Sequence, residues 1–263
     1  MANQYFPYMK KTANIIAILN HKGGVGKTTT TVNIGAALNR KGYRVLMIDL
    51  DPQANLTQSL GLDSDQNAPN IYQALRGMIP GIQTLTKRDG LDIVPSSLDL
   101  SAAEMELSNE ISRESILSRL VAPLQDKYDY ILIDCPPSLG LLTVNALVAS
   151  TGLIIPVQAE FLATRGMSRI MSIIDMVKTR LNKQLPILGV LLTRYDSRKI
   201  LNRDIHDTIK DLFQSDVFTT VIRDNVALAE APAVGEDIFS YQSGSMGAMD
   251  YNAVCEEIIE KLK

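Results

Sequence analysis

KGGVGKTT, residues 22–29, is the stretch of sequence that decides the fold of this chain. It follows an apolar run over residues 15–19, which predicts a buried strand, and it precedes residues 30–38, whose pattern predicts a helix. A glycine-rich loop between a strand and a helix is the setting of a phosphate-binding loop. Its glycines let backbone N–H groups curl around phosphate oxygens, and the helix N-terminus adds partial positive charge at the same point.

The side chains of this loop have separate predicted roles. Lys27 supplies a full positive charge to the β- and γ-phosphates of a nucleotide, and the Thr28 hydroxyl is a ligand for Mg²⁺. We therefore expect ATP and Mg²⁺ as cofactors. The predicted nucleotide-binding residues of the loop are Lys22, Gly23, Gly24, Val25, Gly26, Lys27, Thr28 and Thr29.

Two positions of the loop depart from the ordinary motif. His21 stands where that motif has glycine, and a second lysine, Lys22, opens the loop. Since Lys27 already holds the nucleotide, a second cation is available to reach the phosphates of a nucleotide held by a partner subunit. Such a contact would couple dimerisation to ATP. The alternative is that Lys22 is a solvated loop lysine.

Two further apolar runs end in acids. Residues 44–49 lead to Asp51, and residues 130–133 lead to Asp134. Strand-end acids lie at the ligand-binding edge of a parallel sheet. Asp134 is predicted to hold Mg²⁺ together with Thr28, directly or through a water, because Mg²⁺ takes few protein ligands beside phosphates and waters. Asp51 is predicted to orient or activate the attacking water. Each acid has the alternative of capping the next helix.

The motifs KGGVGKTTT, IDLDPQAN and YDYILIDCPPSLG, in this order and spacing, resemble those of the ParA/Soj family of deviant Walker A partition ATPases. VIRDNVALAEAPAVGEDI resembles the C-terminal segment of that family on the nucleotide and dimer side. The resemblance runs from about Asn14 to the C-terminus. It implies catalysis by Asp51 with Lys22 and Lys27, and nucleotide contacts at Arg223 and Asn225, with the base near Asn225.

The same resemblance implies how the chain would act. Two ATP-bound copies would form a sandwich homodimer, in which Lys22 crosses to the nucleotide of the other subunit. The dimer would bind DNA without sequence preference, and a ParB-like centromere-binding partner would stimulate hydrolysis, which releases the DNA. We expect a cytoplasmic, nucleoid-associated protein with slow ATP hydrolysis, because a switch needs a long-lived bound state.

A basic cluster in residues 194–203 is the candidate DNA-binding surface. If the segment after Arg198 is helical, Lys199 and Arg203 share one face of it. Basic clusters of this kind contact phosphates and make binding salt-dependent. Asp196-Ser197-Arg198 matches a family motif that carries a DNA-binding arginine. The predicted DNA-binding residues are Arg198, Lys199, Arg203 and Arg223; the alternative is a solvated charged face.

Three positions depart from the family where it has basic residues. They are Ala227, Ser243 and Met246. Arg223 is a candidate replacement. Each lost phosphate contact lowers the salt slope by about one unit, so we expect weaker or differently placed DNA binding than in a typical relative.

Composition bounds the remaining possibilities. A length of 263 residues with 46% hydrophobic content suits one α/β domain with a sizeable core. The net charge of −3 excludes bulk basic character, so any DNA contact must be a local patch. Cys135 and Cys255 give no disulfide framework or metal spacing, which fits a reducing compartment. Residues 1–13 are expected to be a flexible extension without a signal peptide, and residues 14–263 the ATPase domain.

Apolar runs recur along the chain with helical patterns between most of them. They lie at residues 14–19, 44–49, 91–94, 130–134, 153–157, 187–192 and 217–222. This alternation predicts a doubly wound, mostly parallel sheet in a single P-loop NTPase domain. Residues 64–90 are the least regular stretch, with a short helix expected over residues 71–75. Residues 138–143, after Asp134, are where a switch loop sensing the γ-phosphate would lie.

Other functions stay open. A MinD-like membrane-surface positioning ATPase needs a basic amphipathic C-terminal helix. Here Glu256, Glu257 and Glu260 would be repelled by anionic lipid, and Ile258 and Ile259 are expected to pack on the core, so we expect no membrane partner. A positioning ATPase for a protein cargo would share the same chemistry. A metabolic ATP-dependent reductase or ligase would want further substrate residues.

Overall fold

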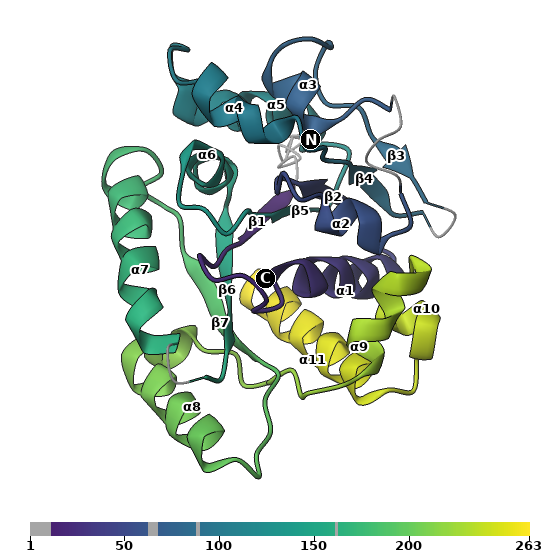
Figure 1. Cartoon of the computed structure of the whole chain (residues 1–263), viewed down its shortest axis with the longest axis vertical. Helices are drawn as coiled ribbons and strands as arrows, with labels where there is room; N and C mark the ends of the chain where they lie inside the picture. The colour runs from purple at the N-terminus through teal and green to yellow at the C-terminus, as the bar shows by residue number, and fades with distance from the viewer. Residues whose placement is uncertain (1–11, 63–67, 88–89, 161–162) are drawn as a thin grey trace, which may run out of the picture.

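Strands and helices alternate along most of the chain in the computed structural model, which describes residues 12–62, 68–87, 90–160 and 163–263. The strands are β1 Asn14–Ile18, β2 Val45–Asp49, β3 Leu85–Thr86, β4 Asp92–Val94, β5 Tyr130–Asp134, β6 Gly152–Gln158 and β7 Ile187–Thr193. The α-helices are α1 Lys27–Arg40, α2 Asn55–Ser59, α3 Ile71–Leu75, α4 Leu100–Glu106, α5 Ile116–Val121, α6 Leu141–Ala149, α7 Ala163–Arg180, α8 Ile200–Phe213, α9 Ala227–Glu230, α10 Ile238–Gln242 and α11 Met246–Lys261. Figure 1 shows the strands in the middle and the helices around them.

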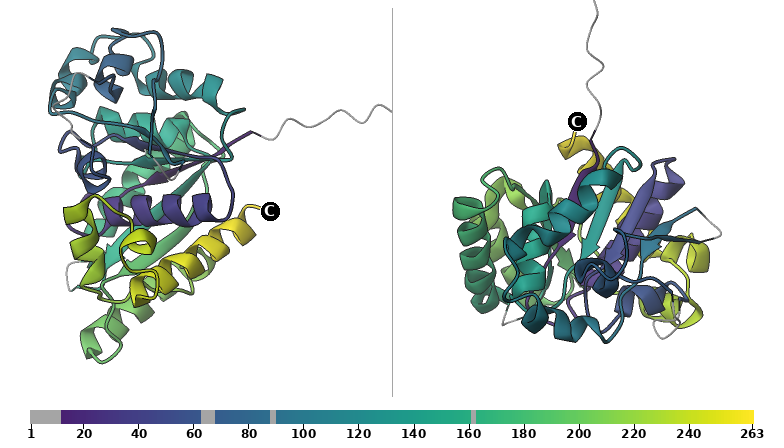
Figure 2. Two further views of the ribbon diagram at one scale, coloured as in Figure 1. Left: turned by 90° about the vertical axis from the view of Figure 1, so that its right-hand side faces the viewer. Right: turned by 90° about the horizontal axis from the view of Figure 1, so that it is seen from above.

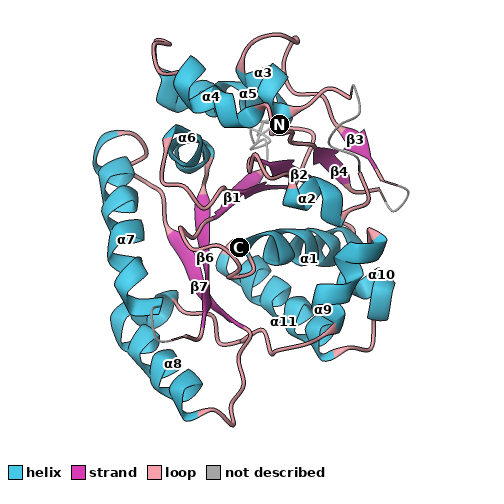
Figure 3. Cartoon of the chain, in the orientation of Figure 1, coloured by secondary structure: helices cyan, strands magenta, loops and turns pink. Residues whose placement is uncertain are grey.

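The strands form one seven-stranded sheet in the order β3-β4-β2-β5-β1-β6-β7. Every pair of neighbours is parallel except β3 and β4, which are antiparallel. The register sets Asp134 opposite both Ile18 and Asp49, so the carboxyl ends of three central strands lie level at one edge. The predicted doubly wound, mostly parallel sheet is confirmed (Figure 3).

Each face of the sheet has its own hydrophobic core, because successive side chains of a strand point to opposite faces. Ile16 and Ile18 of β1 pack with α1, α2 and α11. Ile15 and Ala17 of the same strand pack in the other core, with helices that include α4 to α8. Figure 2 shows α1 and α11 running together along one face. The phosphate-binding loop therefore joins the middle of the sheet to a helix that is buried on most sides.

The C-terminal helix α11 packs into the core rather than presenting an apolar face to a surface. Val254, Cys255 and Ile258 are fully buried, and Ile259 packs against the same core. This confirms the expected packing of Ile258 and Ile259. Among the described residues, no helix is long and apolar enough to cross a membrane.

Residues 217–222 were predicted as a strand and do not form one. The segment runs beside β7 but makes only isolated bridges, Val190 to Val217 and Tyr195 to Arg223. Between them, the N–H groups of Thr219 and Thr220 donate to the Glu257 carboxylate on α11, at 2.9 and 2.8 Å. Because these donors leave the ladder, the apolar run stays irregular although Phe218 and Ile222 are buried.

Two short elements between β2 and β4 test the expectations for residues 64–90. The predicted helix over residues 71–75 is α3, closed at its N-terminus by a capping box between Asn70 and Gln73. The two-residue strand β3 was missed, because a run of that length carries no periodicity.

Residues 1–11, most of the expected N-terminal extension, lie outside the described residues. Its last residue, Ala13, is buried and donates its N–H to the Gln125 carbonyl, so the packed domain begins slightly earlier than expected.

Candidate nucleotide-binding site

The loop between β1 and α1 has the backbone of a phosphate cradle. Gly24 and Gly26 have φ of +74° and +88°, a region that favours glycine. Gly26 is also the N-cap of α1, and no side chain caps it, so the first N–H groups of the helix face the loop. The Thr193 hydroxyl, at the end of β7, donates to the Val25 carbonyl at 2.8 Å and fixes the loop from outside. The loop can therefore offer its amides to an anion.

Lys27 is nearly buried at the first position of α1. Its side-chain Nζ donates to the Lys22 carbonyl at 3.2 Å, across the loop. Burial lowers the pKa of Lys27, while Asp134 and Asp51 act in the opposite direction. A buried ammonium with one carbonyl partner gains most from an added anion. The position suits a ligand for phosphate.

Asp134 closes the end of β5 and is fully buried. It accepts hydrogen bonds from Thr28 Oγ1 at 2.7 Å and from Thr31 Oγ1 at 3.3 Å. Burial, reinforced by the neighbouring Asp49, raises the pKa of Asp134 to about 8. The raised pKa means that the ionised form of this buried carboxylate is unfavourable. A cation bound beside it would stabilise that ionised form. Thr28 and Asp134 thus come together as the predicted pair of magnesium ligands.

The two acids after β2 have different surroundings. Asp49 accepts from the Thr57 hydroxyl at 2.6 Å, the Thr57 N–H at 2.8 Å and the Asp51 N–H at 3.2 Å, and it is fully buried. Asp51 accepts from the Gln53 N–H at 3.0 Å and lines the pocket described next. Asp49 is therefore a structural anchor for the β2–α2 turn, and Asp51 is the acid that faces the site.

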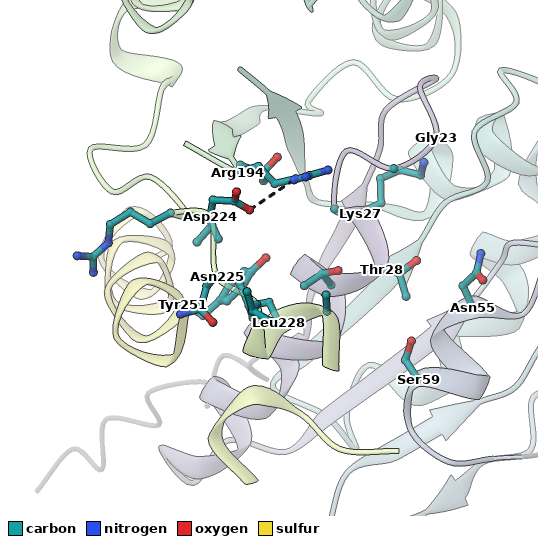
Figure 4. Close-up of a pocket in the computed structure, with 18 of the residues that line it drawn as sticks. Gly23, Lys27, Thr28, Asn55, Ser59, Arg194, Asp224, Asn225, Leu228 and Tyr251 are labelled. Atoms are coloured by element: carbon teal, nitrogen blue, oxygen red, sulfur yellow. Dashed lines mark ion pairs between the residues drawn. The ribbon is translucent and has the colours of Figure 1, made fainter. Parts of the chain in front are cut away.

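A pocket of about 720 Å³ lies over the loop. One wall is the phosphate loop with Lys27 and Thr28, and the opposite wall is the segment of residues 222–229 with Tyr251 of α11 (Figure 4). Asp51 and Pro137 lie on its lining as well. A cavity of this size, with polar groups on both walls and apolar side chains among them on the wall opposite the loop, has the dimensions of a small-molecule site.

Lys22 is turned away from this pocket. Its Nζ donates to a carboxylate oxygen of Glu160, after β6, at 2.7 Å. The hydrogen bond from Lys22 is the main reason that the pKa of Glu160 lies below its usual range. Both side chains are partly exposed, so the pair can open without leaving a buried charge behind.

Arg223 and Asn225 both lie on the pocket lining, and they differ in how far their polar groups are engaged by other residues. The Arg223 guanidinium is engaged with the Asp250 carboxylate, at 2.5 Å from Nη2 and 3.0 Å from Nε, and Asp250 is buried. Asn225 Oδ1 accepts from the Ala227 N–H at 2.9 Å, which leaves its side-chain amide N–H groups for a ligand. The base contact expected near Asn225 stays a prediction.

Three of the candidate DNA-binding residues, Arg198, Lys199 and Arg203, lie apart from the pocket at the start of α8, whereas Arg223 is on the pocket lining. The Arg198 side chain is 88% exposed and pairs with Asp196 at 2.9 Å. Lys199 and Arg203 are exposed as well, and Lys199 is the N-cap of α8. Ala227, where the family has a basic residue, is buried, so the local backbone gives a long side chain no outlet there.

Several pocket residues come from segments that the motifs did not mark. Thr193 ends β7 and Arg194 follows it, and Tyr251 lies on α11, where its hydroxyl is 3.2 Å from that of Thr30. The position of Thr193 at a strand end was a usable signal; Tyr251 carried none. In the expected switch segment, residues 141–143 already belong to α6, and Thr143 Oγ1 donates to the Ser138 carbonyl at 2.6 Å.

Comparisons with known proteins extend these observations over the chain. A family model described as an AAA domain matches residues 13–187. The sporulation initiation inhibitor protein Soj of Bacillus subtilis is 45% identical over 246 residues, covering 93% of this chain and 97% of Soj. The chromosome partitioning protein ParA of Myxococcus xanthus is 42% identical over 250 residues, covering 94% of this chain and 88% of that protein.

A solved structure agrees in fold and in ligand class. A Mycobacterium smegmatis protein described as cobyrinic acid a,c-diamide synthase, with a bound ATP analogue and magnesium, matches with a TM-score of 0.84 and 36% identity. The match covers 95% of this chain and 96% of that one. The similarity therefore includes the sheet, the loop and the C-terminal segment together.

Proposed function

This chain belongs to the ParA/Soj family of P-loop partition ATPases, and from that premise we propose that it is an ATP-driven DNA-partitioning switch. In this proposal ATP orders a homodimer, the dimer holds DNA, and hydrolysis releases it. The observation that carries it is the placement of Lys22. The second lysine of the loop stands outside its own pocket, on a partly exposed ion pair, where it can be transferred to another subunit's nucleotide.

ATP and Mg²⁺ fit the residues of the pocket. The loop amides and Lys27 would hold the β- and γ-phosphates, and Thr28 and Asp134 would hold the metal. Among the described residues there is no group of three or more acids, histidines or cysteines that would hold a metal alone, which suits Mg²⁺ bound between one carboxylate, one hydroxyl and phosphates. Bound Mg²⁺ would neutralise charge that develops on the phosphates.

Asp51 is the proposed positioning group for the attacking water. Its carboxylate lies at the pocket and is oriented by the Gln53 N–H. Asp51→Ala is expected to keep ATP binding and dimerisation while abolishing hydrolysis, measured as phosphate release and by nucleotide titration. Asp211→Ala, which removes an exposed acid of α8, serves as the matched control. Normal phosphate release by the Asp51 variant would remove Asp51 from catalysis.

The proposed DNA surface is the start of α8, with Arg198, Lys199 and Arg203, together with Arg223. In the proposal these cations neutralise DNA phosphates, so each contributes about one unit to the dependence of affinity on salt. A ParB-like centromere-binding protein is the proposed activator of hydrolysis. The protein would act in the cytoplasm, at the nucleoid.

The test is DNA binding by the Asp51→Ala protein, with ATP and with ADP, across a salt series, with its mass measured in parallel. We expect a dimer in ATP that binds DNA of unrelated sequences and releases it as salt rises, and a monomer in ADP that does not bind. An ATP-dependent dimer that ignores DNA would overturn the partition proposal and point to a protein cargo. A protein that stays monomeric in ATP would overturn the sandwich dimer as well.

A further inference from the structure

Arg194 is the first residue after β7, and its backbone is in an unusual conformation. Its φ is +50°, in the left-handed region that residues other than glycine seldom adopt. Such a conformation persists where the surrounding structure fixes it, and it gathers at functional sites. The residue is exposed and lines the nucleotide pocket.

Hydrogen bonds on both sides hold this conformation in place. Thr193, the residue before it, donates its hydroxyl to the Val25 carbonyl in the phosphate loop. Tyr195, the residue after it, donates its N–H to the Ile222 carbonyl at 2.9 Å and accepts at its own carbonyl from the Asp224 N–H at 3.3 Å. The backbone of Arg194 is thus tied to both walls of the pocket, and Figure 4 shows its guanidinium on the side of the phosphate loop.

Within the described residues, the Arg194 guanidinium makes only weak interactions. The distance from Arg194 Nε to Asp224 Oδ1 is 3.6 Å, with 61% and 56% of the two side chains exposed. Exposed pairs of this kind contribute little to stability. Arg194 also acts on Glu160, the partner of Lys22, and helps to hold the pKa of that carboxyl below its usual range. The guanidinium therefore has one long, exposed ion pair, with Asp224, and a weaker electrostatic interaction with Glu160.

The second arginine of the pocket lining provides a contrast. Arg223 is bound through two nitrogens to the buried Asp250, at 2.5 and 3.0 Å. Moving it would leave a buried carboxylate unpaired, which is unfavourable. Arg194 has no such constraint, because Asp224 is exposed and returns to water when the pair opens. Of these two arginines, Arg194 is the one whose guanidinium can turn to a nucleotide without leaving a buried carboxylate unpaired.

We propose that Arg194 is a nucleotide-binding residue whose guanidinium exchanges the Asp224 carboxylate for phosphate oxygens of the nucleotide bound in its own subunit. A guanidinium is weakly hydrated, and its planar fork matches phosphate geometry. It would cover the outer side of the phosphate chain, opposite the loop amides and Lys27. This inference rests on the proposed ATP site and adds a residue to it.

The test uses the full chain with three variants of Arg194 and one of Asp224, and affinities for ATP, ADP and adenosine are measured by calorimetry in the presence of Mg²⁺. Arg194→Gln is expected to lower the affinity for ATP and for ADP by about tenfold or more. A tenfold change in affinity corresponds to about 1.4 kcal/mol. Arg194→Lys, which keeps the charge, should recover part of that loss. Affinity for adenosine should not change in either variant.

A third variant separates binding from folding. Arg194→Gly removes the side chain and suits the positive φ, so it should melt at a temperature equal to or above that of the wild type, yet bind ATP as weakly as Arg194→Gln. Asp224→Asn should bind ATP at least as tightly as the wild type, because it releases the guanidinium.

Three results would overturn the assignment. They are unchanged ATP affinity in Arg194→Gln, an equal loss for adenosine, which would indicate stacking on the base, and full ATP affinity in Arg194→Gly. If the proposed ATP site itself is wrong, the result is different: the wild-type chain does not bind ATP, and Lys27→Ala therefore shows no loss of ATP affinity relative to it.

Discussion

Lys27 is a nearly buried cation that, within the part of the chain that the structure describes, donates a hydrogen bond only to a backbone carbonyl. Because an ammonium in this position is poorly solvated, a phosphate anion is its natural counter-ion. Lys27→Ala is expected to reduce ATP affinity by at least a hundredfold, measured by titration with a fluorescent ATP analogue. Lys41→Ala, at the other end of α1, is the control and should bind normally. ATP affinity retained in Lys27→Ala would contradict the assignment of the phosphate loop.

Asp49 links pH to stability at the same edge of the sheet. Burial raises the pKa of Asp49 to about 6, above the ordinary value of 3.8 for an aspartate, so the folded chain binds more protons than the unfolded chain between these pH values. Stability contributed by this residue therefore falls as the pH rises from about 4 to about 6, and is constant above that.

The comparison of the wild type with Asp49→Asn isolates this effect. Since one pKa unit corresponds to about 1.4 kcal/mol, the wild type should lose on the order of 3 kcal/mol relative to the variant across that window. Urea unfolding at a series of pH values, without Mg²⁺, measures the difference. A constant difference between pH 4 and pH 7 would show that Asp49 does not titrate there.

The residues that the sequence identified are those that follow strands closely. Asp134 ends β5 and Asp51 comes just after β2, while Lys27 and Thr28 begin the helix that the glycine-rich loop joins to β1. A parallel sheet gathers the groups at these strand ends at one edge. Glu160 also follows a strand closely, after the end of β6, so its place was open to the same reasoning. Tyr251 could not be found in this way, because its place depends on the packing of α11, which local patterns do not encode.

At the scale of elements, a glycine in β7 leaves room for the segment of residues 217–222 to pack beside that strand. A Cβ added at Gly189 would lie 2.4 Å from the ring of the buried Phe218, in the segment that runs beside the strand. Gly189→Ala is expected to destabilise the fold by about 2 kcal/mol, because the ring must move in a packed core. Gly244→Ala is the control, since a Cβ there meets nothing within 4 Å. Equal unfolding midpoints for the two variants would contradict this packing argument.

The same segment shows where prediction of elements ended. Residues 217–222 have the apolar pattern of a strand, and Phe218 and Ile222 among them are buried. The backbone nevertheless bonds to Glu257, which is distant in sequence and gives no local warning. The apolar patterns located the two cores well. They could not show that one carboxylate distant in sequence would keep residues 217–222 from forming a strand.

At the scale of the whole molecule, DNA binding and dimerisation are predicted to use separate surfaces. Arg198→Glu, on the exposed start of α8, should weaken DNA binding by at least tenfold and leave ATP-dependent dimerisation unchanged, since it reverses a charge away from the pocket. Fluorescence anisotropy of labelled DNA and light scattering measure the two properties. Arg180→Glu, at the exposed end of α7, is the charge-matched control. Unchanged DNA affinity in Arg198→Glu would place the contact on another surface.

The ion pair between Lys22 and Glu160 has a consequence for timing. In the proposed cycle each protomer must break this contact before its lysine can cross, and the contact re-forms when the protomers separate. Because both side chains are partly exposed, the contact opens at little energetic cost, yet it keeps the lysine away from its own subunit's nucleotide while the protomer is alone. The meeting of two ATP-bound copies, rather than the breaking of this contact, would then set how soon a released subunit pairs again.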